Sequence, residues 1–382
     1  MGFSPHLTPR ILGLLVLLFT LVAGPALLSP TPSSARQVTP GALSCAPQTM
    51  PVDPASLVAS PAADAPAEVP TGELTEVTMG YVPVSIFAPV FVALEKGYYA
   101  EQGLDVSLEP LPGGSDMVVL TANEQFDAGI GGAGPAFWNA LEQGLPLKVI
   151  APGHMEGNPV ATPLMISTED CESGAIESVA DLEGKKVSVN ARGATEYWLA
   201  EALGTAGLTL DDVDLQTLPF PDAVAALQSG AIDAAMVGEP LATLAEQDGI
   251  AVRLLTDFPV QEIQPTLIYA NESFLNDNPE AAVGLVTAYL KASRDLTGAG
   301  FKDPANLAII EQYTQVPAAL IASAVQPLYA VDGDIDAEGL NKLQQFFRER
   351  DQLEYDENLD PAGFIDTSYV EAALDELGPY QG

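Results

Sequence analysis

Cysteine is scarce in this sequence, which contains only Cys45 and Cys171 among its 382 residues. Two cysteines are too few for the disulfide framework of a small secreted domain. Three alternatives stay open for them. They pair with each other in an oxidising compartment, they stay free, or Cys45 is lipidated, because Ala42-Leu43-Ser44-Cys45 distantly resembles a lipobox.

Histidine is equally scarce, with only His6 and His154 in the chain. A histidine-based metal site and a Ser-His-Asp arrangement are therefore excluded for the part that follows the N-terminal leader. No Walker motif and no dinucleotide-binding glycine loop is present either. We expect no metal, no cofactor and no enzymatic activity. Paired carboxylates stay open as catalytic groups, although no pair stands out.

Positive charge is the third shortage, since 14 Lys and Arg residues face 52 Asp and Glu residues and the formal net charge is −38. Such a field repels nucleic acid and anionic lipid, so neither is expected as a partner. It is typical of a solvated acidic surface. Hydrophobic residues make up 47% of the chain, which is ample for a large core.

Long hydrophobic runs are limited to one, over residues 11–28, which follows Arg10 and precedes small residues up to Ala35. This pattern predicts a secretory signal peptide over residues 1–35, cleaved near Ala35. The alternative is an uncleaved membrane anchor, because the run is long enough to cross a thin bilayer. Either interpretation places the rest of the chain outside the cytoplasm.

Residues 36–73 are rich in Pro, Ala, Ser and Thr and show no apolar period, which predicts a flexible tether. About 300 residues of globular sequence follow, more than a single hydrophobic core usually holds. Strand-like and helix-like runs alternate along them. We predict strands near residues 77–81, 106–111, 128–130 and 147–151, separated by helices near 88–101, 115–123 and 137–143. This alternation predicts parallel sheets with helices on both faces.

The same pattern occurs twice. The string Val-x-Leu-x-x-Leu-Pro begins at Val106 and again at Val213, and each copy follows a Gly-Leu pair. Each is followed by a helical run and then by Asp-Ala, at Asp127 and at Asp233. Any two strand–helix–strand units resemble each other to some extent, but here the whole order of elements is repeated. We therefore predict two similar α/β lobes.

Lobe one is predicted to consist of residues 74–165 and 264–382, and lobe two of residues 166–263. Strands at 163–167 and 264–270 are expected to form the hinge, and helices at 281–293, 340–350 and 368–377 are expected to pack back on lobe one. In such sheets a ligand lies beyond the carboxyl ends of the strands. Two facing lobes can close on it by hinge motion.

Several stretches of this sequence resemble one family. Ala93 to Tyr99 reads Ala-Leu-Glu-Lys-Gly-Tyr-Tyr, Asp181 to Val187 reads Asp-Leu-Glu-Gly-Lys-Lys-Val, and Phe364 to Tyr369 reads Phe-Ile-Asp-Thr-Ser-Tyr. In order and spacing they resemble the nitrate, sulfonate and taurine receptors of ABC importers, a family that includes thiamine-pyrimidine and riboflavin binders. The resemblance covers residues 77–377.

The resemblance implies a type II periplasmic-binding-protein fold, in which two doubly wound α/β lobes are joined by a two-strand hinge. It also implies a small-molecule ligand and a membrane permease as partners, and we expect a monomer. Two alternatives stay open. One is an enzyme on the same fold that acts on a pyrimidine-like substrate, and the other is a receptor that signals to a membrane sensor.

Candidate ligand residues follow from the expected strand ends and helix starts. Backbone amides at helix starts favour electronegative groups, and aromatic rings stack on flat ones. His154 follows a strand, and Arg192 is one of few cations. The resemblance also implies ligand contacts at the turn from Asn190 to Tyr197. The candidates are Pro83, Ser85, Phe87, Gly114, Ser115, Gly134, Phe137, Trp138, His154, Asn190, Arg192, Gly193, Ala194, Thr195, Tyr197, Phe220, Asp222 and Glu239.

Among these candidates aromatic residues outnumber cations. A flat heterocycle, such as a pyrimidine or a flavin, is therefore favoured slightly over a sulfonate or nitrate. Thr195 is expected to cap the helix that follows it.

Overall fold

The computed structural model describes residues 43–53, 57, 72–111, 114–261 and 263–381. The predicted signal peptide over residues 1–35 lies outside the described residues. In the described part, no helix is both long and apolar enough to cross a membrane.

The first sheet has five strands in the order β2-β1-β3-β11-β4. β1, β2 and β3 are parallel, whereas β11 runs antiparallel between β3 and β4. We call the part of the chain built on this sheet lobe one. Its strands are β1 (Thr75–Tyr81), β2 (Leu104–Pro110), β3 (Ala128–Gly132), β4 (Leu147–Pro152) and β11 (Thr266–Asn271).

The second sheet, the basis of lobe two, repeats this arrangement with the order β8-β7-β9-β6-β10. β7, β8 and β9 are parallel, and β6 runs antiparallel between β9 and β10. The predicted internal repeat is therefore confirmed at the level of topology. The strands are β6 (Leu164–Ser167), β7 (Lys186–Val189), β8 (Asp214–Thr217), β9 (Ala234–Met236) and β10 (Ala251–Leu255).

The repeated Asp-Ala pair has the same structural task in both lobes. The carboxylate of Asp127 accepts a hydrogen bond from the amide of Thr78 in β1 at 2.8 Å, and that of Asp233 accepts one from the amide of Lys186 in β7 at 2.8 Å. Each aspartate thus joins the start of the third strand to the first. This part of the repeat stabilises the sheet and does not face the ligand site.

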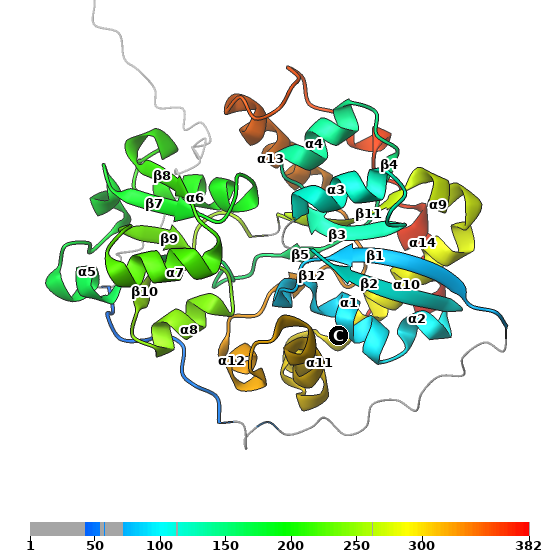
Figure 1. The fold of residues 1–382 in the computed structure, drawn as a ribbon, viewed down its shortest axis with the longest axis horizontal. Coiled ribbons are helices and arrows are strands. Elements are labelled where there is room, and N and C mark those ends of the chain that lie inside the picture. The colour runs from blue at the N-terminus through cyan, green and yellow to red at the C-terminus, as the bar shows by residue number, and fades with distance from the viewer. Residues whose placement is uncertain (1–42, 54–56, 58–71, 112–113, 262, 382) are drawn as a thin grey trace, which may run out of the picture. The chain divides into compact units, whose positions relative to one another are not determined.

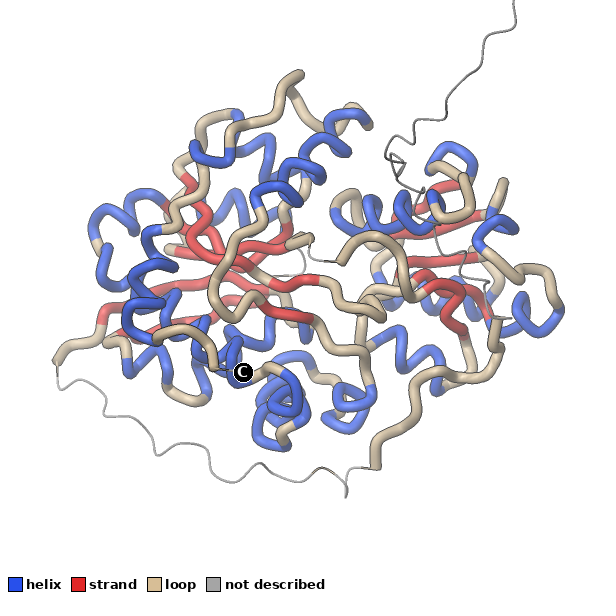
Figure 2. The backbone as a smooth tube through the Cα atoms, turned by 180° about the vertical axis from the view of Figure 1, so that it is seen from behind, coloured by secondary structure: helices blue, strands red, loops and turns tan. Residues whose placement is uncertain are grey.

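Helices cover both sheets, and the two groups of elements are visible from either side (Figures 1 and 2). In lobe two they are α5 (Thr168–Ser173), α6 (Ala194–Gly204), α7 (Phe220–Ser229) and α8 (Leu241–Gln247). In lobe one they are α1 (Ala88–Glu95), α2 (Tyr98–Glu101), α3 (Gly114–Ala122), α4 (Pro135–Glu142), α9 (Glu272–Asp277), α10 (Pro279–Asp295), α11 (Pro304–Thr314), α12 (Ala318–Ser323), α13 (Ala337–Glu349) and α14 (Ser368–Leu377). A small two-stranded sheet is formed by β5 (His154–Met155) and β12 (Leu328–Tyr329). The described part also contains short 3-10 turns, which are η2 (Ser85–Phe87), η3 (Val179–Leu182), η4 (Leu210–Asp212), η5 (Gly298–Lys302) and η6 (Pro361–Gly363).

Two predicted elements differ from the structure. The helix predicted over residues 88–101 is divided into α1 and α2, because Gly97 adopts a left-handed φ of 76° that ends the first helix. The strands predicted as the hinge, 163–167 and 264–270, are largely sheet strands (β6 and β11). The chain crosses between the sheets just before each of them, over residues 156–163 and over the described residues 256–261 and 263–265.

The C-terminal helices pack on lobe one as predicted, but one of them also contacts lobe two. α10 packs against α1 and α14, within lobe one. α13 contacts both α4 of lobe one and α6 of lobe two. In Figure 1 it lies between these two helices.

Part of the segment predicted as a tether is held against the body. Cys45 and Cys171 form a disulfide, so this pairing resolves the alternatives left open by the sequence. The amide of Gln48 and the hydroxyl of Thr49 donate hydrogen bonds to Glu246 in lobe two at 3.2 and 2.7 Å. The amide of Val52 then donates to Ser323 Oγ of α12 at 2.9 Å. Residues 43–53 are therefore an attached strap.

Candidate functional site

A cavity of about 900 Å³ lies where the two lobes face each other, and segments of both lobes line it. It sits beyond the carboxyl ends of β1, β3, β7 and β9, where the parallel arrangement predicts a ligand site. Most of the predicted candidates line it, and they are Pro83, Ser85, Phe87, Gly134, Phe137, His154, Asn190, Arg192, Gly193, Ala194, Thr195, Phe220 and Glu239.

Lobe one contributes a largely apolar wall. The turn after β1 brings Ser85 and Phe87 to the cavity, where both are almost fully buried. Phe137 of α4 lies beside them with its ring against Tyr269, at 5.6 Å between centroids. This wall is therefore built from side chains that also pack in the hydrophobic core.

Two helix starts meet across the cavity. Gly134 precedes α4 of lobe one and Gly193 precedes α6 of lobe two. A Cβ atom built on Gly134 would lie only 3.8 Å from the Cα of Gly193. The first amides of a helix have no partner within it and carry partial positive charge. The two lobes therefore direct a shared positive potential toward one end of the cavity, which suits an electronegative group.

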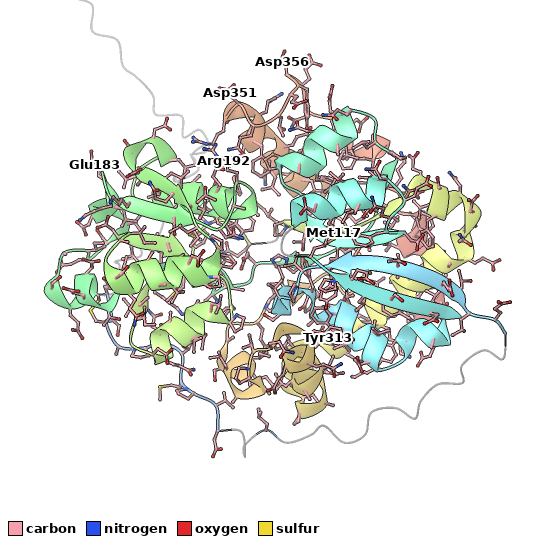
Figure 3. All side chains as sticks on the ribbon, in the orientation of Figure 1. Met117, Glu183, Arg192, Tyr313, Asp351 and Asp356 are labelled. Carbon is pink, nitrogen blue, oxygen red and sulfur yellow. A yellow bond between two sulfur atoms is a disulfide. The ribbon has the colours of Figure 1, made fainter. Side chains whose placement is uncertain are left out.

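The start of α6 differs in detail from the prediction. Gly193, not Thr195, occupies the capping position, and Thr195 lies inside the first turn. The hydroxyl of Thr195 donates instead to the side-chain oxygen of Asn190. This bond holds the loop after β7 in place. Arg192, on that loop, is exposed on the side of lobe two that faces lobe one (Figure 3).

His154 is a buried wall residue, only 5% exposed. Its backbone amide donates to Thr266 Oγ1 at 2.9 Å, and its Nδ1 lies 2.7 Å from the same oxygen. Burial lowers the pKa of His154 to about 3, so the ring is neutral at physiological pH. Because Thr266 already accepts from the backbone, we assign its hydroxyl proton to the bond with Nδ1. The Nε2–H group is then left as a donor.

Glu239 lines the cavity, but its carboxylate is already paired. Arg253 donates to it at 2.7 Å through Nη2 and to Glu246 at 2.8 Å through Nε. All three side chains are at most 2% exposed. Burial alone would lower the pKa of Arg253, but the two carboxylates outweigh that effect and raise it. Glu239 is therefore part of a buried triad and is not a free ligand group.

Glu156 is a wall residue that sequence reasoning missed. It lies in the first crossing segment, 1% exposed, and accepts hydrogen bonds from the amide of Ala161 at 2.6 Å and from Trp198 Nε1 at 2.9 Å. Burial raises the pKa of its carboxyl, whereas these hydrogen bonds oppose the rise. Glu156 thus ties the crossing segment to α6. The only sequence feature that could have pointed to Glu156 as a wall residue is its position just before Asn158-Pro159.

Three predicted candidates do not line the cavity. Trp138 is fully buried core, with its Nε1 donating to the carbonyl of Ala133 at 2.8 Å and its ring packed edge-on against that of Phe137 at 5.2 Å. Tyr197 packs edge-on against Phe346 of α13 at 5.1 Å. Asp222 is exposed on α7. Gly114 and Ser115 begin α3, and whether they reach the cavity lies outside what the structure describes.

Other wall residues come from segments that were not predicted to reach the cleft. Thr314 is the last residue of α11, Val316 follows that helix, and Gln352 follows α13. Gly238 also lines the cavity. The ring of Phe220 packs on the backbone of Gly238, where a Cβ atom would lie only 2.9 Å from that ring. No local pattern distinguishes Thr314, Val316 and Gln352, since they are far from the strand ends in sequence, whereas Gly238 lies just after β9.

Residues 85–299 of this chain match the family described as NMT1/THI5 like, and this match covers more than half of the chain. The chain belongs to that family. The resemblance stated from the sequence alone is thereby confirmed.

Individual relatives resemble this NMT1/THI5-like chain over part of their length. The riboflavin-binding protein RibY of Chloroflexus aurantiacus is 29% identical over 63% of this chain and 68% of its own length. The bicarbonate transport ATP-binding protein CmpC of Synechococcus elongatus is 29% identical over 61% of this chain. The match spans only 36% of CmpC, about a third of that longer protein.

Solved structures confirm the predicted fold. The periplasmic nitrate-binding protein NrtA of Synechocystis superposes with a TM-score of 0.64 over 80% of this chain and 90% of its own, at 16% identity. The alkanesulfonate-binding protein SsuA of Xanthomonas axonopodis, bound to MOPS, superposes with a TM-score of 0.62 over 78% of this chain and 100% of its own, at 16% identity. The desulfurization enzyme DszB superposes with a TM-score of 0.58 over 79% of this chain and 99% of its own, at 18% identity.

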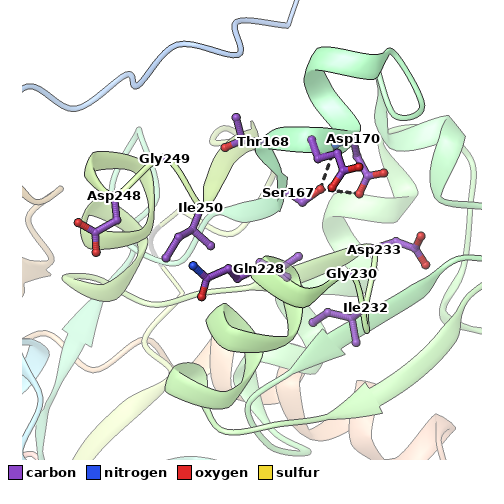
Figure 4. A pocket seen from close by; sticks show the side chains of 12 residues that line it. Ser167, Thr168, Asp170, Gln228, Gly230, Ile232, Asp233, Asp248, Gly249 and Ile250 are labelled. Atoms are coloured by element: carbon purple, nitrogen blue, oxygen red, sulfur yellow. Dashed lines mark hydrogen bonds between the residues drawn. The ribbon is translucent and has the colours of Figure 1, made fainter.

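A second, smaller cavity of about 350 Å³ lies within lobe two, away from the facing strand ends (Figure 4). Its wall includes the carboxylates of Asp170, Asp233 and Asp248. The hydroxyl of Ser167 caps α5 by accepting from the amide of Asp170 at 3.0 Å, so this part of the wall serves the helix start. The acidic groups have no convergent arrangement around a metal, and no metal-binding group of His, Cys, Asp and Glu occurs in the described part of the chain.

Proposed function

We propose that this protein is an extracytoplasmic receptor of an ABC importer, which captures a small organic solute in the cavity between its lobes. The observation that carries the proposal is the cavity itself, since it lies at matched strand ends and takes its walls from both lobes. Relatives with the names of nitrate-binding and riboflavin-binding proteins support it. The proposed partners are the solute and a membrane permease, and the proposed state is a monomer.

A flat heterocycle, such as a pyrimidine or a flavin, is the favoured solute. The volume of about 900 Å³ falls in the range of pockets that hold drug-sized molecules, about 300–1,000 Å³. A nitrate or bicarbonate ion would leave most of that space to water. Phe87, Phe137 and Phe220 make the wall aromatic, with Phe220 the most accessible of the three, whereas Arg192 is the one Lys or Arg residue along the described wall.

The two facing helix starts would receive the electronegative end of such a solute. A carbonyl edge, a phosphate or a sulfonate would accept hydrogen bonds from the amide of Ala136 in α4, whose first residue is a proline without an N–H group, and from the first amides of α6. Arg192 would add positive charge at the rim. A sulfonate with an organic body is therefore the next candidate, and it would bind with the same orientation.

Capture would use closure at the two crossing segments. We propose the lobe limits given above from the sequence, with residues 1–35 as an export signal. Catalysis is not part of the proposal. DszB shows that an enzyme uses the same fold, so turnover has to be tested as well as binding.

A thermal-shift screen tests the proposal directly. The purified protein would be heated with riboflavin, thiamine, pyrimidines, alkanesulfonates, taurine, nitrate and bicarbonate, one at a time. A ligand present at 100 times its dissociation constant stabilises the folded state by about 2.7 kcal/mol. We expect a clear upward shift with a heterocycle. If no compound raises the melting temperature and one of them is consumed, the receptor proposal is wrong and the enzyme alternative gains.

A further inference from the structure

The contact between α13 and lobe two goes beyond what the cavity alone requires. The buried face of α13 includes Leu343 and Phe347, which belong to the same hydrophobic cluster as Trp198 of α6 and Phe137 of α4. Tyr197 of α6 packs on Phe346 of α13 as well. One helix of lobe one therefore shares its packing with both lobes.

The centre of this contact is Glu196, a completely buried carboxylate in the first turn of α6. Arg350 donates to its Oε1 from Nε at 3.0 Å. Gln352 donates to both of its oxygens from Nε2, at 3.0 and 2.9 Å. In the described part of the chain, all side-chain partners of this carboxylate come from the segment after α13. Lobe one alone therefore satisfies a buried charge of lobe two.

Gln352 is itself fixed on the lobe-one side. Its backbone amide donates to the carbonyl of Phe347 at 2.9 Å, and its carbonyl accepts from the side chain of Asn139 in α4 at 3.2 Å. Asp351, labelled in Figure 3, ends the helix with a left-handed φ of 54° and turns the chain toward lobe two. Because Gln352 Oε1 is buried without a partner in the described part, the orientation of this amide depends on Glu196.

The same residues adjoin the candidate ligand site. Glu196 follows the turn of Gly193, Ala194 and Thr195, whose amides face the cavity, and Gln352 lines the cavity. Separation of the lobes would break charge-assisted hydrogen bonds, which are stronger than neutral ones. It would also move the start of α6 away from α4.

We propose that Glu196, Arg350 and Gln352 form an interlobe clasp that holds the ligand-facing start of α6 against lobe one. Glu196 and Arg350 act as positioning residues, because they act on the solute through the α6 turn, whereas Gln352 also lines the cavity. The clasp keeps the cleft closed and slows the release of a bound solute. This second effect rests on the proposed function, whereas the effect on cleft closure does not.

Two substitutions at one position test the clasp. Gln352→Met keeps the length of the side chain but removes the donor to Glu196, and Gln352→Lys supplies a charged donor in its place. Arg350→Gln provides a second variant that weakens the same carboxylate contact. Lys342→Met is the control, since Lys342 lies on α13 in an exposed pair with Glu338.

The first measurement is small-angle X-ray scattering of each purified protein without solute. We expect a larger radius of gyration for Gln352→Met and Arg350→Gln, and the parental value for Gln352→Lys and Lys342→Met. A purely structural role would instead lower the melting temperature of both Gln352 variants without this contrast. Parental scattering from Gln352→Met and Arg350→Gln would overturn the clasp.

The second measurement is the dissociation rate of riboflavin, followed by its fluorescence. We expect Arg350→Gln, at a position that does not line the cavity, to release it about ten- to a hundredfold faster, as the loss of a hydrogen bond to a charged group predicts, with little change in association rate. An unchanged release rate would overturn the effect on retention. If riboflavin does not bind the parent protein, the proposed ligand is wrong, and scattering alone decides whether the clasp exists.

Discussion

The two lobes have the same strand order but hold different chemistry. In lobe one, the cavity wall is made of rings and a neutral histidine, and no ion pair in its described part has both side chains buried. Lobe two contains the triad of Glu239, Arg253 and Glu246, with all three side chains at most 2% exposed. The disulfide also joins the strap to lobe two, because Cys45 of the strap is bonded to Cys171 of α5. Topology sets where the loops converge, whereas the side chains on those loops decide what each lobe contributes.

This asymmetry has a physical consequence. An apolar wall keeps its shape without partners, but a buried charge is stable only while its partner is present. The triad accepts hydrogen bonds from outside its own sheet, from Gln48 and Thr49 of the strap and from the amide of Val325 after α12, at 3.2 Å. Lobe two is therefore held by contacts that lobe one does not need. Four predictions test this difference, in order of expected effect.

The largest effect is expected from Arg253→Met, which leaves two buried carboxylates without their cation. Removal of one partner from a buried ion pair costs about 3–5 kcal/mol. We expect a loss of this size in the free energy of unfolding, measured by urea denaturation. The exposed pair of Lys342 and Glu338 gives the matched control, and Lys342→Met should cost about 0.5 kcal/mol or less. A loss below about 1 kcal/mol for Arg253→Met would show that lobe two does not depend on the triad.

The disulfide is expected to rank next. Cys45 and Cys171 are 126 residues apart, so their bond restricts a long loop of the unfolded chain. The double substitution of both cysteines by serine should lower the free energy of unfolding by about 2–4 kcal/mol. The parent protein under a reducing agent should approach the same value, while the variant should not respond. Equal stability of parent and variant would mean that the strap contributes nothing to lobe two.

His154 gives lobe one a specific dependence on pH. Its pKa is about 3 in the folded protein and near 6.5 when exposed, so between these values the unfolded chain binds more protons. Stability contributed by the neutral ring is therefore complete above pH 6.5 and is lost as the pH falls toward 3. The slope is at most about 1.4 kcal/mol per pH unit.

His154→Gln removes this titration. Denaturation of parent and variant from pH 7 to pH 4 should show a shallower loss of stability in the variant, even where its stability at pH 7 is lower. Parallel curves would show that His154 is not the group that titrates. The buried Glu156 changes stability in the opposite direction, because its pKa is raised, and it is present in both proteins.

The smallest effect is expected from Arg192→Ala at the exposed rim. A pair of probes with the same ring system, riboflavin and its 5′-phosphate, separates charge recognition from ring recognition. We expect the phosphorylated probe to lose about three- to tenfold in affinity and riboflavin to lose little, because an exposed ion pair is worth at most about 1 kcal/mol. Titration calorimetry measures both. An equal change for the two probes would remove Arg192 from the recognition of charge.

Much of the fold could be predicted from local patterns, because a strand or helix reveals its buried face through the spacing of its own apolar residues. The repeat that begins at Val106 and Val213 predicted two lobes, and the sheets have the same strand order. The loops after the strands were found in the same way, and they include Pro83, Gly134 and Arg192 along the cavity.

What only the tertiary structure decided is which partner each side chain meets. Trp138 and Phe137 are neighbours in sequence and both are buried, yet only Phe137 also lines the cavity. Glu239 was predicted as a ligand group, but Arg253 occupies its carboxylate. Gln352 reaches Glu196 from 156 residues away. Periodicity carries information about burial within one element, whereas pairing depends on contacts between segments that are distant in the chain and meet only in the folded protein.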